Sequence, residues 1–583
     1  MRSMVPFEIK INGRMTNVTS KRNLLHVAAD RRPILCFLGV IILLNLIQSA
    51  FTDLTGDEAL YWMYGQLPDW GYKDHTPVIG MMIHLGSKLL PGSIGARLLV
   101  VAALAITLYL VWLLASPVRT GPFVLLAASM PVLHIYGFIA TPDVPLLLAT
   151  SAYLVVWKSF LAEPGWRRAL WLGFWMGALV WSKYHGLLVI LFTWLPHRRL
   201  WLNGWYWMAG AIGIVLFAPH LIWQIAHDLP SVRFHLIERS GEFRWASLLE
   251  FVAGQAGLFN PLVWIMGLIV LARIRPDNDF ERSLRALAWL IWFFFLAMSL
   301  RGRVEAHWTA VCAIPVIILL TRHRLKWLES RWFKWSSILF IALIAGGRLA
   351  LMVDFLPPLY KSFHLPEKKL RLVHDLAGGS PVCFMNSYQD PSLYMFYFDQ
   401  LAHAEQNVDG GRNQYNWWTF NEHVHKKDFL FVASYHVAGF EEIERDGVTV
   451  YVRRYSDLPV LHQLDIQPQF VKYTVKEGDT LQIPCRVVNG NTYPLNFPDP
   501  SHEISWSFLM SHKKPWQQKL TPEWLNWPGH LDAGEAANAM LRLVLQVPPG
   551  SYRCGVAARV DRLPATYQSG WIWLIVQPRE SLD

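Results

Sequence analysis

Two acidic sites lie close together near the start of the chain and could perform acid–base chemistry. Asp57-Glu58 is followed seventeen residues later by Asp74-His75, and the stretch between them is rich in Tyr and Trp. One carboxylate of a pair can act as a general base while the other orients it, and a histidine beside an acid can donate to a leaving phosphate. Asp57 and Glu58 could equally be the acidic first turn of a helix, which the helix dipole favours.

Further polar clusters interrupt the apolar sequence downstream. They are Thr141-Pro142-Asp143, Lys183-Tyr184-His185, Ser231-Val232-Arg233-Phe234-His235 with Arg239, and Arg301-Gly302-Arg303-Val304-Glu305-Ala306-His307-Trp308. The cations could bind a phosphate through charge-assisted hydrogen bonds. Structural interpretations stay open beside this one: Asp143 as a helix N-cap, Lys183 as a snorkelling lysine, and Arg301 with Arg303 as an ordinary positive loop.

The elements that must position these groups are membrane helices. Of the 583 residues, 53% are hydrophobic and only 16% are charged, whereas soluble domains carry about 25% charged residues. The net charge of +10 does not indicate a nucleic-acid binder, because the basic residues form short clusters between apolar runs, where they set orientation in a membrane. The composition therefore predicts a multi-pass membrane protein.

Eleven apolar runs are predicted to span the membrane. They lie at 34–51, 96–115, 122–139, 142–160, 169–181, 184–196, 205–226, 246–272, 283–300, 307–321 and 335–353. Basic pairs such as Arg31-Arg32, Arg167-Arg168 and Arg198-Arg199 fall in alternate connections, which predicts a cytoplasmic N-terminus, an outer location for everything after the last span, and polar clusters that share the outer face.

The outer region divides into two parts by pattern. Residues 356–457 contain strand-like runs at Val382–Met385, Phe429–Ala433 and Val448–Val452, typical of a small α/β module. Residues 458–583 contain alternating runs such as Thr480–Val488 and Leu541–Val547, which favour an antiparallel β-sandwich. Cys485 and Cys554 lie on two of its predicted strands, either as a disulfide or as two buried thiols.

The clusters together resemble a known family. Gly56-Asp57-Glu58, Tyr72, Asp74-His75-Thr76-Pro77, Thr141-Pro142-Asp143, Ser182-Lys183-Tyr184 and Val304-Glu305-Ala306-His307-Trp308 resemble the GT-C polytopic membrane glycosyltransferases. The similarity is greatest to bacterial members of the protein O-mannosyltransferase and aminoarabinose (lipid A) transferase superfamily. Asn386-Ser387-Tyr388-Gln389 and Arg412-Asn413-Gln414-Tyr415 in the outer module resemble segments of the same bacterial members.

The resemblance implies an inverting enzyme that takes a sugar from a polyprenyl phosphate and passes it to a protein, lipid A or glycan at the outer face of the cytoplasmic membrane. It makes Asp57 the general base and Glu58 its catalytic neighbour. The substrate-binding residues that it and the clusters indicate are Asp74, His75, Asp143, Lys183, Tyr184, Arg233, Arg239, Arg301, Arg303, Glu305, His307 and Trp308.

The resulting prediction is a mainly α-helical GT-C membrane domain over 1–355, an outer α/β module over 356–457 and a β-sandwich over 458–583. No cofactor is required by it, although Asp57, Asp74, His75 and Asp143 could hold a divalent cation if their loops converge. Two alternatives are a transporter of lipid-linked saccharides and a non-catalytic envelope assembly protein. The transporter should show inverted repeats and ionisable groups near mid-span, neither of which is visible in the sequence.

Overall fold

The computed structural model describes residues 31–116, 119–227, 229–233, 245–408, 410, 412–512 and 518–579. Within these ranges, seven helices are long and apolar enough to cross a membrane. They are α2 (Arg31–Phe51), α5 (Gly92–Ala115), α8 (Asp143–Ala162), α11 (Gly204–Ala226), α15 (Asp279–Ser299), η3 with α16 (Ala306–Cys312 and Ala313–His323), and α18 (Arg331–Met352), which continues into α19 (Pro357–Ala377). The protein is a multi-pass membrane protein.

Two further predicted spans are bent helix pairs. The axes of α6 (Thr120–Ala128) and α7 (Pro131–Phe138) differ by 73°, and those of α13 (Trp245–Phe259) and α14 (Pro261–Arg273) differ by 102°. Each second helix begins with a proline at its first turn. Proline lacks the N–H that would continue the preceding helix, and it disfavours helical geometry in the residue before it.

The two predicted spans that remain, 169–181 and 184–196, correspond to helices shorter than a membrane span. Residues 169–181 lie in α9 (Trp166–Ser182, 17 residues) and residues 184–196 lie mostly in α10 (Gly186–Trp194, 9 residues). Nine helical residues rise about 14 Å, less than half of a bilayer core of about 30 Å. The number of eleven crossings therefore stays a prediction.

The α/β module contains one five-stranded sheet in the order β2-β1-β3-β5-β4. Its strands are β1 (Val382–Met385), β2 (Ala402–Glu405), β3 (Phe429–Ala433), β4 (Glu441–Arg445) and β5 (Val448–Tyr455). The first three are parallel, and β5 and β4 are antiparallel additions. Between β1 and β2 runs α20 (Gln389–Phe398). The three strand runs predicted for this module are confirmed.

The C-terminal region has two main sheets around a shared apolar core. Their orders are β11-β10-β15-β17-β7 and β12-β14-β8-β6. The strands are β6 (Leu464–Pro468), β7 (Lys472–Lys476), β8 (Thr480–Asn489), β10 (Ile504–Ser511), β11 (Gln518–Leu520), β12 (Glu523–Leu525), β14 (Ala536–Val544), β15 (Gly550–Val560) and β17 (Ile572–Gln577). Three short strands, β9 (Leu495–Asn496), β13 (His530–Leu531) and β16 (Thr566–Tyr567), complete the region. Cys485 and Cys554 are free buried thiols, so of the two alternatives the structure shows the unpaired one.

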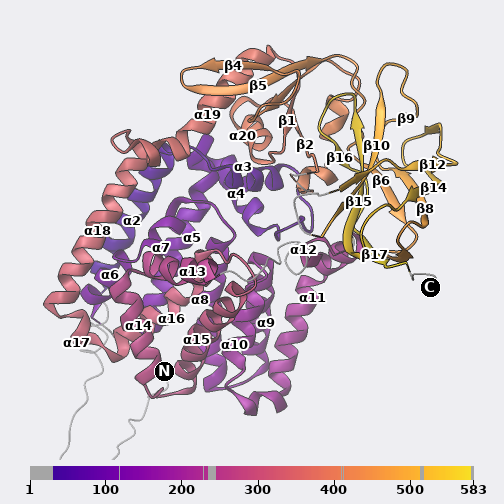
Figure 1. Ribbon diagram of the computed structural model, residues 1–583. Helices are drawn as coiled ribbons and strands as arrows, with labels where there is room; N and C mark the ends of the chain where they lie inside the picture. Colours follow the sequence, from indigo (N-terminus) through magenta and orange to yellow (C-terminus); the bar gives the residue numbers. More distant parts are fainter. Residues whose placement is uncertain are drawn as a thin grey trace, which may run out of the picture.

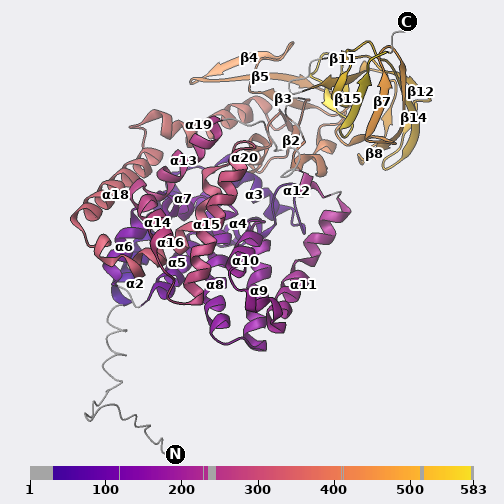
Figure 2. The same ribbon diagram turned by 60° about the horizontal axis from the view of Figure 1, so that its bottom comes forward.

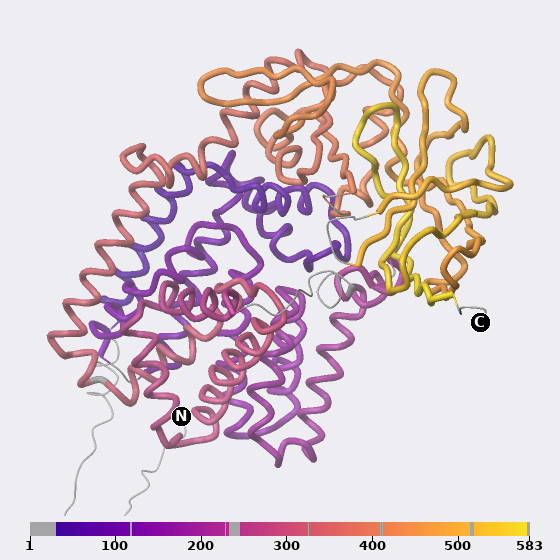
Figure 3. The backbone as a smooth tube through the Cα atoms, viewed as in Figure 1, coloured from indigo at the N-terminus to yellow at the C-terminus, as the bar shows by residue number. Residues whose placement is uncertain are grey.

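Both non-membrane parts lie at one end of the helical bundle. In Figure 1, α19 leads from α18 across this end to the module's sheet, and the β-sandwich lies beside it above α12 (Pro230–Arg233) and α11. The view in Figure 2 shows the same end from another side, and in Figure 3 an indigo segment of the chain, which includes residues 56–66, lies close beneath the module. We call this the module end of the bundle.

Candidate active site

The helix α3 (Gly56–Gln66) at the module end presents the first acidic pair. Thr55 is its N-cap: the Thr55 hydroxyl accepts from the Glu58 N–H, and the Glu58 carboxylate accepts from the Thr55 N–H. This capping box satisfies two backbone donors that a helix start otherwise leaves without partners. The sequence Thr-Gly-Asp-Glu therefore fixes where α3 begins, and it places Asp57 and Glu58 in its first turn.

Glu58 is fully buried against Arg97 of α5. The Arg97 Nε donates to Glu58 Oε1 and its Nη2 donates to Oε2, both at 2.7 Å, and neither side chain is exposed to solvent. The Ala140 N–H donates to the same carboxylate, while Arg97 also donates to the backbone carbonyls of Thr52 and Asp53. Glu58 thus links α3, α5 and the 139–143 turn. Both of its carboxylate oxygens accept hydrogen bonds that hold these segments together.

Asp57 has the opposite environment, because its side chain is exposed at the module end. Its Oδ1 accepts from the Tyr388 hydroxyl at 3.1 Å and from Gln389 Nε2 at 2.9 Å. Among the described residues, Oδ2 has no hydrogen-bond partner. Burial, with a smaller contribution from Asp57, raises the pKa of Tyr388, so its hydroxyl keeps the proton that it donates. The carboxylate is oriented through one oxygen and accessible through the other.

Gly56 allows this contact. A Cβ at position 56 would lie 2.4 Å from the Cβ of Gln389, a distance that carbon atoms do not reach without displacement. The glycine therefore lets the N-terminus of α20 pack directly on the first turn of α3 and brings Gln389 to Asp57.

The second acidic site lies in the loop between α3 and α4 (Val78–Leu89). Tyr64 donates its hydroxyl proton to Asp74 Oδ1 at 2.8 Å and stacks on Tyr72 with ring centroids 3.7 Å apart. His75 packs edge-on against Tyr61, and its Nε2 lies 3.9 Å from Asp74 Oδ2. Burial lowers the pKa of His75, which favours the neutral imidazole.

Asp143 and Lys183 form a second ion pair that is almost fully buried. The Lys183 Nζ donates to both carboxylate oxygens of Asp143 at 2.9 Å. The Nε2 of His307 lies 4.0 Å from Asp143 Oδ2. The predicted cation and the predicted acid are therefore partners, which α8, the turn before α10 and η3 bring together.

Tyr184, beside this pair, anchors the loop that carries Asp74. Its hydroxyl contacts Ser231 Oγ at 2.7 Å and His220 Nε2 at 2.9 Å, and Ser231 donates to the Tyr72 carbonyl. Residues of α11 and α12 thereby hold the loop between α3 and α4 in place.

The last cluster is more open. Arg301 and Arg303 are exposed, and Arg303 lies 3.4 Å from Glu305. Trp308 packs on His185 with ring centroids 5.5 Å apart. The predicted residue Arg239 lies outside the described residues, and Arg233 is described only as the last residue of α12.

His75 lies near the charged groups of several clusters. The charges of Asp74, Lys183, Asp143 and Asp57 all affect the pKa of its imidazole. A cluster of three carboxylates, one lysine and one histidine at the module end can accept a proton from a hydroxyl and stabilise a departing anion.

The sequence did not indicate every part of this site. Arg97 lies within the predicted span 96–115 and was not among the predicted site residues. Lys73 was assigned no role, yet its N–H donates to Gln414 Oε1 at 2.8 Å and its Nζ donates to the Arg412 carbonyl. The only signal for the contribution of the module was the likeness of the segments around Tyr388 and Gln414 to those of bacterial relatives.

A divalent cation does not fit the site as the side chains lie. No three of Asp57, Asp74, His75 and Asp143 bring ligand atoms within 4.8 Å of one another, whereas two other groups of described residues do. Asp57 is also oriented by Tyr388 and Gln389, and Asp143 by Lys183.

Sequence comparisons find similarity between part of this chain and known glycosyltransferases. The profile of a family described as dolichyl-phosphate-mannose-protein mannosyltransferase matches residues 74–223. The lipid A galacturonosyltransferase RgtD of Rhizobium johnstonii is 24% identical over 322 residues, which cover 52% of this chain and 65% of the relative. The match thus spans a little less than two thirds of that relative's length.

Solved structures show the same fold. ArnT from Cupriavidus metallidurans in the apo state superposes with a TM-score of 0.55 at 14% identity, covering 73% of this chain and 98% of ArnT. The structure of that ArnT bound to undecaprenyl phosphate gives a TM-score of 0.52 at 13% identity, with 72% and 97% coverage. The predicted GT-C fold is confirmed.

Proposed function

We propose that this protein transfers a sugar from a polyprenyl-phosphate-linked donor to an acceptor hydroxyl, with inversion, at the outer face of the cytoplasmic membrane. The observation that carries the proposal is the contrast within one acidic pair. Glu58 is buried and paired with Arg97, whereas Asp57 is exposed and held through a single oxygen. Only Asp57 of the two can accept a proton from a substrate.

In the proposed reaction, Asp57 Oδ2 takes the proton of the acceptor hydroxyl as its oxygen attacks the anomeric carbon. The bond from that carbon to the donor phosphate breaks, and the electron pair leaves with the phosphate. Lys183, His75, His307, Arg301 and Arg303 are the groups we assign to this phosphate, because charge-assisted hydrogen bonds stabilise the charge that it gains on leaving.

The structure modifies one of these assignments. Lys183 already neutralises Asp143 at 2.9 Å, so a phosphate must share its ammonium group with that carboxylate. The exposed Arg301 and Arg303 are the cations that can turn toward a phosphate without breaking a buried ion pair.

The relatives support the choice of substrates. ArnT has been solved with undecaprenyl phosphate, and the curated relative RgtD acts on lipid A. We therefore propose a polyprenyl phosphate as the carrier of the sugar, and lipid A as the first acceptor to test before a glycan or a protein hydroxyl.

Reconstitution with defined donors tests the proposal. The protein in nanodiscs is incubated with undecaprenyl-phosphate sugars and lipid A, and mass spectrometry follows the acceptor and the released carrier phosphate. We expect a product with a lipid-linked sugar and none with the matching sugar nucleotide. Equal use of the sugar nucleotide would contradict the proposed donor.

The orientation has a separate test. Asp446 is exposed in the turn between β4 and β5, and Arg331 is exposed at the start of α18. In a Cys36→Ser background, a cysteine at position 446 should react with an impermeant maleimide from outside the cell, and a cysteine at 331 should react only after permeabilisation. The reverse pattern would overturn the orientation.

A further inference from the structure

Three potential metal ligands meet away from the candidate active site, where the α/β module joins the β-sandwich. His403 and Glu405 lie two residues apart on β2, so their side chains share one face of the sheet. His462 lies in the connection between β5 and β6, the first strand of the sandwich. The ligand atoms of the three residues all lie within 4.8 Å of one another.

The distances suit a small, tetrahedrally coordinated ion. His403 Nε2 lies 3.2 Å and His462 Nδ1 lies 3.3 Å from the same Glu405 oxygen, Oε2. Tetrahedral ligands at about 2.0–2.1 Å from zinc are about 3.4 Å apart. A modest widening of this triangle would accommodate the ion.

The second nitrogen of His462 is oriented as in known metal sites. Its Nε2 lies 2.9 Å from the Tyr415 carbonyl, which can only accept a hydrogen bond, so Nε2 carries a proton. Nδ1 of the neutral ring then presents a lone pair toward the Glu405 carboxylate. Two facing acceptors need a cation between them, which is either a bound metal ion or a second proton on His462, and a backbone carbonyl behind the other nitrogen is the usual support of a metal-bound histidine.

The cluster is also buried. The side chains of His403, His462 and Glu405 are 0%, 1% and 14% exposed.

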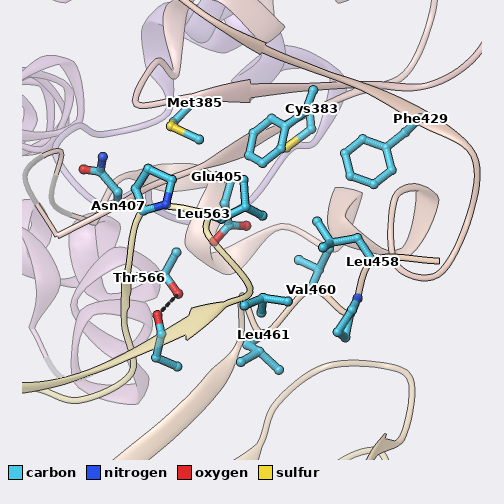
Figure 4. A pocket seen from close by; sticks show the side chains of 15 residues that line it. Cys383, Met385, Glu405, Asn407, Phe429, Leu458, Val460, Leu461, Leu563 and Thr566 are labelled. Atoms are coloured by element: carbon cyan, nitrogen blue, oxygen red, sulfur yellow. Dashed lines mark hydrogen bonds between the residues drawn. The ribbon is translucent and has the colours of Figure 1, made fainter. Parts of the chain in front are cut away.

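Glu405 also borders a narrow cavity between the two outer parts. Figure 4 shows it among Cys383, Met385 and Phe429 of the sheet, Leu458 and Leu461 of the connection, and Leu563 of the sandwich. It is the only charged residue in this otherwise mainly apolar lining.

The other ligand group among the described residues is different in kind. It consists of Asp277, Glu281 and His323, and Arg322 Nε is 3.2 Å from Glu281 Oε1. An arginine already neutralises that carboxylate, and Asp277 is exposed. The group is accounted for as an ion pair.

We propose that His403, Glu405 and His462 bind one Zn²⁺ ion, which fastens the connection to the β-sandwich onto the sheet of the α/β module. Two imidazoles and a carboxylate are a ligand set that zinc occupies in known proteins. The role is distinct from sugar transfer, and it does not depend on the proposed reaction.

A second proton on His462 would also satisfy its contact with Glu405. The test therefore measures zinc binding directly. Tag-free, chelator-treated full-length protein in detergent is titrated with ZnCl₂, and bound zinc is measured by elemental mass spectrometry after buffer exchange. We expect about one tightly bound zinc per chain and a higher melting temperature of the zinc form.

Ligand variants locate the ion. Glu405→Gln and His462→Gln should each weaken zinc binding by more than about 100-fold, because even residues behind the ligands typically contribute about 10–100-fold. His530→Gln is the matched control, since His530 is an exposed histidine of the sandwich that contacts Asp532, and it should bind zinc like the parent protein.

Two results would overturn the proposal: no retained zinc in the parent protein, or equal zinc affinity in the parent and both ligand variants. If the variants do not fold, the visible absorption spectrum of the parent protein loaded with Co²⁺ tests the site instead. A tetrahedral visible spectrum that zinc abolishes supports the site, and its absence refutes it.

Discussion

Glu58→Gln separates a positioning role of this residue from a catalytic one. Glu58 Oε1 accepts from Arg97 Nε at 2.7 Å and from the Ala140 N–H at 2.8 Å, while Oε2 accepts from Arg97 Nη2 at 2.7 Å and from the Thr55 N–H at 3.0 Å. A glutamine keeps one acceptor oxygen, and its amide would face donors at the other position. It also leaves the Arg97 guanidinium buried without a counter-charge.

The expected loss is about 3–5 kcal/mol, the usual result of removing one partner of a buried ion pair. That is a large share of a typical folding stability of about 5–15 kcal/mol. The assay is thermal and denaturant unfolding of the purified protein in detergent, with transfer measured per folded molecule. Unfolding should shift strongly, while the remaining folded protein should transfer sugar at a rate within about tenfold of the parent.

A double variant sharpens the test. Glu58→Leu with Arg97→Met should recover part of the stability, because apolar residues of similar volume often replace a buried ion pair without loss. The reasoning is refuted if Glu58→Gln unfolds like the parent protein but loses transfer by about 10²–10⁴-fold, since that is the behaviour of a general base.

Three further variants probe neighbouring parts of the structure. Gly56→Ala should displace Gln389 and lower the transfer rate by about tenfold or more with little change in donor binding; an unchanged rate would show that this contact does not orient the base. Lys183→Met should lower stability by about 3–5 kcal/mol by leaving Asp143 buried without its partner, as unfolding will show; a parental midpoint would contradict the buried pair. His425 has its pKa lowered to about 4 by burial and by Lys426, so as pH falls from about 6.5 to 4 the unfolded chain binds a proton that the folded chain does not. This histidine should lower stability over that range by at most about 3 kcal/mol, and His425→Gln should reduce the pH slope of the unfolding curves by its share, because other histidines also contribute.

Much of this fold could be predicted because its patterns are local. The apolar runs, the three strands of the module and the acidic first turn of α3 each depend on residues within a short window. The prediction for Leu541–Val547 was displaced, since β14 runs from Ala536 to Val544 and pairs with β8 along that length. Pairing with a neighbouring strand overrides the weak strand preference of the Ala-rich start.

The candidate site was predictable only in part, because the division of roles within it depends on distant contacts. The capping box marks Glu58 locally, but its burial and ion pairing, which separate its role from that of Asp57, come from Arg97, 39 residues after Glu58 in the chain. The orientation of Asp57 by Tyr388 similarly joins residues 331 positions apart. Such pairings follow from how helices and modules pack, which no short window of sequence specifies.

The most direct test of the account is the transfer rate of Asp57→Asn. Asparagine keeps the size of the side chain and an oxygen for Tyr388 and Gln389, but it cannot accept the acceptor's proton. Membranes of a deletion strain supply the natural acceptor, and Asp69→Asn is the control, because Asp69 is an acid of the same region that accepts from Trp223.

With equal folding and equal donor binding, Asp57→Asn should transfer sugar about 10²–10⁴-fold more slowly than the parent, while Asp69→Asn stays within about tenfold of it. A folded Asp57→Asn protein that works at the parental rate would contradict the assignment of Asp57 as the base.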